Sequence, residues 1–144
     1  MHYVQIVDPG ISNAERPGTY PAFDLGQQLD VFIRNSSGQP FVGKVWTGGP
    51  TVWPDFTHPK AVEYWYEVMN SYHQLVPIDG AWIDMNDPSN FNDGSMYGGC
   101  VNDPNDSDYV LDHPAYIPAG NVSVFSRGIQ ENLLLSFLSW PRYS

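Results

Sequence analysis

Cysteine is almost absent from this sequence: Cys100 is the only one among 144 residues. No disulfide can therefore form within the chain, and no cluster of cysteines can hold a metal ion. Long hydrophobic runs are missing as well, because a membrane-spanning helix needs about 18–20 consecutive apolar residues and no stretch approaches that length. The first residues lack the basic leader and apolar core of a signal peptide. We expect no membrane span, and the sequence leaves the location of the chain unassigned.

Basic side chains are scarce too. Six Lys and Arg residues face 16 Asp and Glu residues, for a formal net charge of −10. Such a surface repels nucleic acids and anionic membranes, so neither is an expected partner. The acidic balance does not indicate disorder, since 42% hydrophobic and 15% aromatic residues are sufficient for a packed core.

One helix is predicted clearly, over about residues 58–73. Thr57 is a good N-cap for it, and its apolar face consists of side chains spaced by four, three and four residues. The helix joins two short apolar runs, residues 3–7 and 81–83, which read as strands. A strand, a helix and a strand in this order predict a parallel βαβ unit with a right-handed crossover. The face residues are Ala61, Trp65, Val68 and Tyr72.

The insertion between the first strand and the helix has little periodicity. Residues 10–30 are rich in Gly, Pro and Asn, and we expect a loop there. The runs 31–33 and 41–46 flank a Gly-containing segment, which predicts a hairpin. Asp8 directly precedes a proline, and this favours a turn residue over a functional carboxylate.

The chain is organised around the run Ala81–Ile83 and the polar segment that follows it. A short apolar run bounded by Gly80 and Pro88 is typical of a buried parallel strand, and Asp84 stands at its end. In parallel α/β barrels, functional groups gather where strands end. A carboxylate beside a Trp suits sugar chemistry, because the indole packs on a pyranose ring and the carboxylate meets developing positive charge. The alternative is an Asp that bonds to nearby backbone amides.

Residues 82–91 read Trp-Ile-Asp-Met-Asn-Asp-Pro-Ser-Asn-Phe. This segment closely resembles the signature of glycoside hydrolase family 31, and its α-glucosidase branch in particular. The resemblance implies that Asp84 is the catalytic nucleophile. It also implies that Trp82, Met85, Trp46 and Ile6 shape the subsite that holds the reacting glucose. The family usually has Glu where this chain has Asp87, a shortening by one methylene that leaves the nucleophile position unchanged.

The resemblance also predicts the fold, an α/β partial (β/α)8 TIM barrel. Residues 1–120 are expected to form about strands 3–4 of the catalytic barrel with the loop excursion after strand 3, and residues 121–144 an unmatched tail. A complete barrel needs about 250 residues. Half a barrel leaves strand edges and apolar faces uncovered, so we expect the isolated chain to be poorly soluble or molten.

Family 31 enzymes retain the anomeric configuration, so the implied activity is retaining hydrolysis of α-glucosidic bonds in maltose-type oligosaccharides. The resemblance implies no metal or organic cofactor. It places the acid/base carboxylate on a later barrel strand, beyond the matching residues, so the chain alone is expected to be inactive or nearly so. The alternative is an inactive fragment that binds sugar or associates with a full-length relative.

A calcium-binding loop is a third hypothesis for the acidic stretch after the signature. Asp103, Asn105 and Ser107 have the one-three-five spacing of an EF-hand. The sixth position, however, holds Asp108 where that motif needs Gly, and the twelfth holds Pro114 where it needs Glu. We expect a solvated acidic loop instead.

Overall fold

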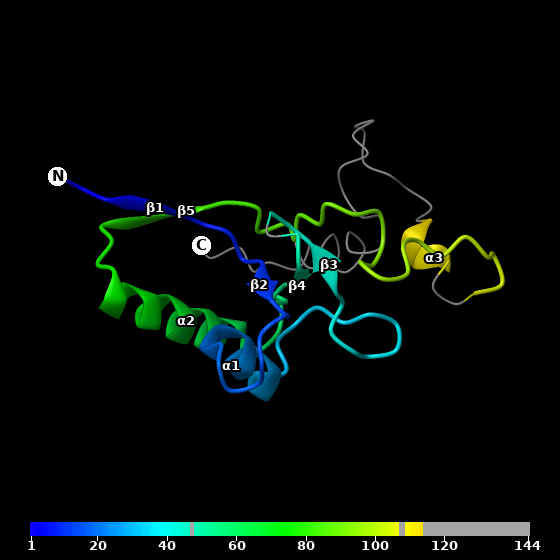
Figure 1. The fold of residues 1–144 in the computed structure, drawn as a ribbon, viewed down its shortest axis with the longest axis horizontal. Helices are drawn as coiled ribbons and strands as arrows, with labels where there is room; N and C mark the ends of the chain where they lie inside the picture. The colour runs from blue at the N-terminus through cyan, green and yellow to red at the C-terminus, as the bar shows by residue number, and fades with distance from the viewer. Residues whose placement is uncertain (47, 107–108, 114–144) are drawn as a thin grey trace, which may run out of the picture.

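The computed structural model describes residues 1–46, 48–106 and 109–113 (Figure 1). The strands form two small sheets, a parallel pair with the order β1-β5 and an antiparallel sheet with the order β2-β4-β3. The elements in chain order are β1 (Val4–Val7), β2 (Ile11–Ser12), α1 (Pro21–Leu29), β3 (Gly43–Lys44), β4 (Pro50–Val52), α2 (Ala61–Leu75), β5 (Gly80–Ile83) and α3 (Tyr109–Asp112).

The parallel pair confirms the βαβ prediction. β1 and β5 lie side by side with Val4 opposite Gly80 and Val7 opposite Ile83, and α2 is the helix that immediately precedes β5. At the start of the pair, the Tyr3 amide donates to the Asp79 carboxylate at 2.6 Å, and this bond lowers the pKa of Asp79. The described residues therefore contain a parallel βαβ unit of a partial barrel, without a closed barrel.

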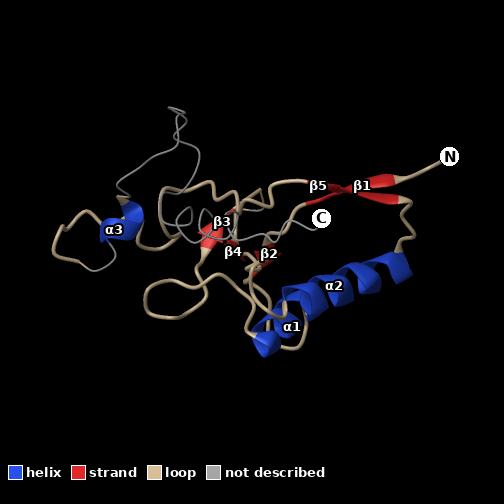
Figure 2. Cartoon of the chain, turned by 180° about the vertical axis from the view of Figure 1, so that it is seen from behind, coloured by secondary structure: helices blue, strands red, loops and turns tan. Residues whose placement is uncertain are grey.

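The expected burial of the second strand is wrong. Ala81, Trp82 and Ile83 are all exposed. The β1-β5 pair runs alongside α2 and extends away from the small antiparallel sheet, as Figures 1 and 2 show. In a complete parallel sheet, strands gain burial from neighbouring strands and from helices on both faces. Within the described ranges, β1 is the only strand paired with β5.

The insertion after β1 forms the antiparallel sheet, and the predicted hairpin is only partly correct. The turn does close, since the Asn35 amide donates to the Gln39 carbonyl at 2.8 Å and the Phe41 amide to Ile33 at 2.7 Å. Beyond it, the two runs part. β3 pairs with β4, while Phe32 bridges to Pro54. Residues 50–54 therefore pair with both runs, in place of the pairing of the two runs with each other.

The loop expected over residues 10–30 is also wrong, since it contains β2 and the helix α1. Pro21 begins the helix, where a missing N–H costs nothing. Gly26 lowers the helix propensity, yet the packing requires it. A methyl group there would collide with the Phe32 ring, which lies on the helix. Tertiary contact has overridden a weak local signal. The resulting core contains Ile11, Leu29, Val31, Phe32, Val52 and Tyr64.

The predicted helix exists, but it begins at Ala61 and not near residue 58. Thr57 is not its N-cap, because the Thr57 amide and hydroxyl both bond to the Asp55 carboxylate in a separate turn. The most buried helix residue is Tyr64, which the predicted face omitted. Its hydroxyl donates to the Ala22 carbonyl at 3.0 Å, and burial raises its pKa. This bond ties α2 to α1.

The rest of the acidic stretch is only partly described. The tail 121–144 and position 114 lie outside the described residues, as do positions 107 and 108 of the calcium hypothesis. None of the helices in the described part of the chain combines the length and the apolar character that a membrane span requires.

Candidate active site

The parallel pair presents two apolar side chains to solvent on one face. Ile6 lies directly opposite Trp82 in the register of β1 and β5. Side chains paired across neighbouring strands point to the same face of a sheet. Ile6 is 47% exposed and Trp82 is 56% exposed. Two of the predicted pocket residues are thereby brought together on an accessible surface.

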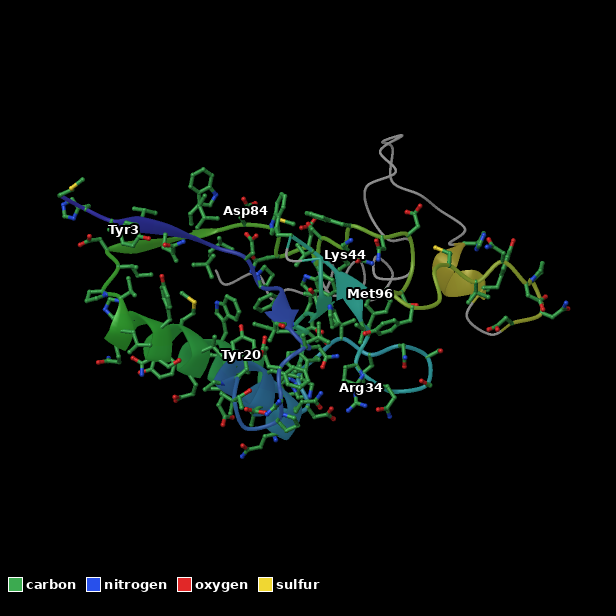
Figure 3. The ribbon with its side chains drawn as sticks, viewed as in Figure 1. Tyr3, Tyr20, Arg34, Lys44, Asp84 and Met96 are labelled. Carbon is green, nitrogen blue, oxygen red and sulfur yellow. The ribbon has the colours of Figure 1, made fainter. Side chains whose placement is uncertain are left out.

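Asp84 follows β5 directly and lies where the two parallel strands end. Its amide donates to the Val7 carbonyl at 3.3 Å, so the pairing extends to its backbone, and its side chain is exposed. One carboxylate oxygen accepts a bond from the Met85 amide at 2.9 Å. The bond to a nearby backbone amide, which was the alternative role considered for Asp84, is therefore present. It uses only one of the two carboxylate oxygens. Figure 3 shows Asp84 just beyond the strand, on the side away from α2.

Met85 adopts a backbone conformation that is uncommon for its residue type. Its φ is +55°, in the left-handed region that favours glycine and asparagine. Holding such a conformation costs about 1–3 kcal/mol, and strain of this kind is often found at functional sites. The strained residue turns the chain immediately after Asp84.

Trp46 comes from the insertion but is held at the strand ends. Its indole N–H donates to a carboxylate oxygen of Asp8 at 2.9 Å. Its ring meets Phe91 in an edge-to-face contact, with the ring centroids 4.7 Å apart. Asp8 follows β1 as Asp84 follows β5, so three separate segments meet here. Trp46 remains 70% exposed.

Asn90 anchors the segment after the signature to the insertion. Its side chain is fully buried. The carboxamide oxygen accepts from the Lys44 amide at 2.8 Å, while the nitrogen donates to the Asn92 and Gly94 carbonyls at 3.0 and 2.8 Å. The Phe91 amide then donates to the Lys44 carbonyl at 2.8 Å. These bonds place Phe91 where it meets Trp46.

Sequence reasoning favoured a turn residue at Asp8 and missed the contact that its side chain makes. Its side chain accepts the bond from Trp46, from a residue 38 positions along the chain. One signal could have found it. Side chains alternate along a strand, so Asp8 continues the face of Ile6 just as Asp84 continues that of Trp82. Asn90 and Phe91 were within the recognised signature but had no assigned role.

The arrangement suits the recognition and cleavage of a sugar. A carboxylate stands at the end of a parallel strand, accessible to solvent, beside exposed indole rings. Aromatic faces bind the apolar side of a pyranose, and a carboxylate can attack or stabilise an anomeric centre. A barrel glycoside hydrolase is one class of protein that combines parallel βαβ units with such a site at the strand ends.

Comparisons with known proteins place the chain within that class. The family described as "Glycosyl hydrolases family 31 TIM-barrel domain" matches residues 1–124, and the chain belongs to this family. It is 46% identical over 116 residues to the lysosomal α-glucosidase of Mus musculus, a match that covers 81% of this chain and 11% of that protein. It is 44% identical over 119 residues to the intestinal sucrase-isomaltase of Oryctolagus cuniculus, covering 81% of this chain and 6% of the relative.

A solved structure supports the same assignment. The chain resembles the glucosidase II α subunit in its α3-Glc2-bound form, with a TM-score of 0.52 and 30% sequence identity. That likeness covers 62% of this chain and 10% of the other. The chain thus spans about a tenth of the lysosomal relative and of this structure.

Proposed function

We propose that this chain contributes the nucleophile segment of a retaining α-glucosidase. The observation that carries the proposal is the position of Asp84. It follows the second strand of a parallel pair, within the signature of the family, with an exposed carboxylate. In this role Asp84 attacks the anomeric carbon and forms a covalent glycosyl-enzyme intermediate, which water then hydrolyses.

Four further residues are proposed to form the subsite of the reacting glucose. Ile6 and Trp82 supply an apolar surface on one face of the β1-β5 pair, and Trp46 adds a second indole near the strand ends. The turn at Met85 sets the direction in which the chain leaves Asp84. Support comes from the pairing of β1 with β5 and from the exposure of both indole rings.

The second carboxylate of a retaining site sits about 5–5.5 Å from the nucleophile. We assign the acid/base role to none of the carboxylates described here. The proposal holds that residues 1–120 supply one part of a catalytic barrel, whose other strands carry the acid/base, and that residues 121–144 form a separate tail. The substrate class is an α-glucoside oligosaccharide.

A chimeric enzyme tests the proposal. In it, the 116-residue stretch of Mus musculus lysosomal α-glucosidase that aligns with this chain is replaced by the residues of this chain that align with it. We expect the chimeric enzyme to hydrolyse p-nitrophenyl α-glucoside, and to leave the β-glucoside intact. A folded, soluble chimeric enzyme without α-glucosidase activity would contradict the proposal.

The Asn90 anchor provides a further prediction. Gly94 has a φ of +74°, and a methyl group there would collide with the backbone of Gly99 and Cys100. In the chimeric enzyme, Gly94→Ala should displace the carbonyl that accepts from Asn90 and lower kcat/KM by about tenfold or more, because misplaced site residues lose positioning. The matched control is Gly98→Ala in the same loop, whose added methyl meets only the Ser95 side chain. Equal activity of the two variants would argue against the anchor.

A further inference from the structure

The hydrogen bond between Asp8 and Trp46 joins two parts of the chain that are far apart in the sequence. Asp8 follows β1 of the βαβ unit, and Trp46 follows β3 in the insertion. One carboxylate oxygen of Asp8, Oδ2, accepts the indole N–H at 2.9 Å. A bond from an N–H to an ionised carboxylate is stronger than one between two neutral groups. It is therefore suited to fixing an otherwise exposed ring.

The second oxygen of Asp8 shows how the residue acts. Oδ1 is buried and has no hydrogen-bond partner among the described residues. A buried acceptor without a partner is costly, and native structures keep few of them. Oδ1 is covered, and Oδ2 accepts the indole N–H of Trp46. Within the described residues, the bond to Trp46 is therefore the polar contact through which the Asp8 carboxylate can act on the sugar site.

Two contacts at different points of the ring define the orientation of Trp46. Asp8 holds the N–H edge, while Phe91 makes an edge-to-face contact with an interplanar angle of 87°. A Trp side chain has two rotatable torsions, and an exposed one would otherwise sample several rotamers. The two contacts together remove that freedom before a ligand arrives. Preorganisation of this kind favours binding because less ordering remains to be done.

We propose that Asp8 is a positioning residue of the sugar site, which orients the indole of Trp46 through a charge-assisted hydrogen bond. The inference rests on the proposed function, in which Trp46 lines the glucose subsite. Asp8 itself neither donates a proton to the substrate nor contacts it.

The test uses the chimeric enzyme and three substitutions. Asp8→Leu removes the acceptor, whereas Asp8→Asn keeps an acceptor oxygen of the same shape. Trp46→Phe removes the indole donor. We expect Asp8→Leu to raise KM by about tenfold with a smaller change in kcat, because a contact made before and during the reaction contributes uniform binding. Asp8→Asn keeps an acceptor but not the charge, so it should raise KM above that of the unsubstituted chimeric enzyme and less than Asp8→Leu does. Asp93→Leu, at an exposed carboxylate of the later loop, is the matched control.

Coupling between the two residues is the second measurement. In the Trp46→Phe background the indole donor is gone, so adding Asp8→Leu should have little further effect on KM. Isothermal titration with 1-deoxynojirimycin, a glucose-shaped iminosugar, measures affinity independently of turnover and should follow the same order. A merely structural role of Asp8 predicts a loss of active enzyme, with a lower apparent kcat, an unchanged KM and additive effects.

The outcomes separate the two proposals. The positioning role is overturned if the chimeric enzyme is active and Asp8→Leu changes neither its KM nor its affinity for the iminosugar. It is also overturned if the effects of Asp8→Leu and Trp46→Phe are additive. Both outcomes leave the proposed function standing. A folded chimeric enzyme that neither hydrolyses the glucoside nor binds the iminosugar overturns the proposed function and the positioning role together.

Discussion

Replacing Asp84 with Asn is expected to lower kcat of the chimeric enzyme by at least about 10³-fold, since removal of a catalytic nucleophile typically costs that much or more. An amide is close to a carboxylate in shape, and it can still accept the bond from the Met85 amide. It cannot form the glycosyl ester, however, because its nitrogen and oxygen are poor nucleophiles. The loss should therefore appear in kcat and leave the fold intact.

A nearby carboxylate provides the control for this substitution. Asp87 lies three residues on, is exposed, and accepts a bond from the Ser89 hydroxyl at 3.0 Å. Asp87→Asn keeps that acceptor and should change kcat by less than about tenfold, which is the range of a modest positioning effect. Hydrolysis of p-nitrophenyl α-glucoside measures both variants. Near-normal kcat in Asp84→Asn would exclude Asp84 as the nucleophile.

The covalent intermediate gives a second, independent readout. A fluorinated α-glucosyl fluoride that reacts quickly but hydrolyses slowly should leave its sugar on Asp84, because retaining enzymes pass through a glycosyl ester. Mass spectrometry of the digested chimeric enzyme should find the added mass on the peptide that contains residues 82–91, and should not find it in Asp84→Asn. Labelling of another carboxylate would reassign the nucleophile.

The 144-residue chain expressed alone is expected to show no sharp thermal transition. The β1-β5 pair is a two-stranded sheet, and isolated two-stranded sheets are marginal in water. Apolar side chains of this pair and of α2 are exposed: Val4, Ile6, Trp82, Ile83, Tyr66 and Leu75. Burial of one large apolar side chain contributes about 1.5–3 kcal/mol. The summed free energy lost when several such side chains stay exposed is comparable with the ~5–15 kcal/mol by which a whole domain is stable.

Circular dichroism, calorimetry and dye binding measure this expectation. The helix signal should decline gradually on heating, without a calorimetric peak, and the chain should bind a dye specific for exposed apolar surface. The chimeric enzyme, in which further strands and helices can cover the β1-β5 pair, should melt cooperatively and bind little dye. A monomeric 144-residue chain with a single cooperative transition would show that the β2-β4-β3 sheet, α1 and the first part of α2 are a sufficient fold.

Local sequence patterns predicted the elements whose signals do not depend on distant contacts. Residues 3–7 and 81–83 are apolar runs ended by turn residues, and both form strands. The helix that joins them has a clear periodic face, so its existence was predictable although its first residue was not. The signature around Asp84 was recognisable because the identity and order of its residues, independent of any contact, mark the family.

Distant contacts decided the elements for which local reasoning failed. α1 was missed because Gly26 weakens the helix signal. The reason for a glycine at this position is visible only in the tertiary structure, where the Phe32 ring packs against it. The hairpin was overestimated because residues 50–54 pair with both of its arms. The exposure of β5 likewise depends on which strands and helices lie beside it. The sequence of the strand alone cannot predict these neighbours.

The sequence by itself determined the parallel βαβ unit and the carboxylate at its end, since alternation, helical periodicity and an ordered signature are properties of neighbouring residues. Only the tertiary structure decided that Asp8 meets Trp46. The two residues lie 38 positions apart and follow strands of two different sheets. Their hydrogen bond forms because β3 and the Asn90 anchor bring the insertion back to the end of β1. A hydrogen bond requires groups to be close in space, and closeness in space between distant residues is set by the packing of the whole chain.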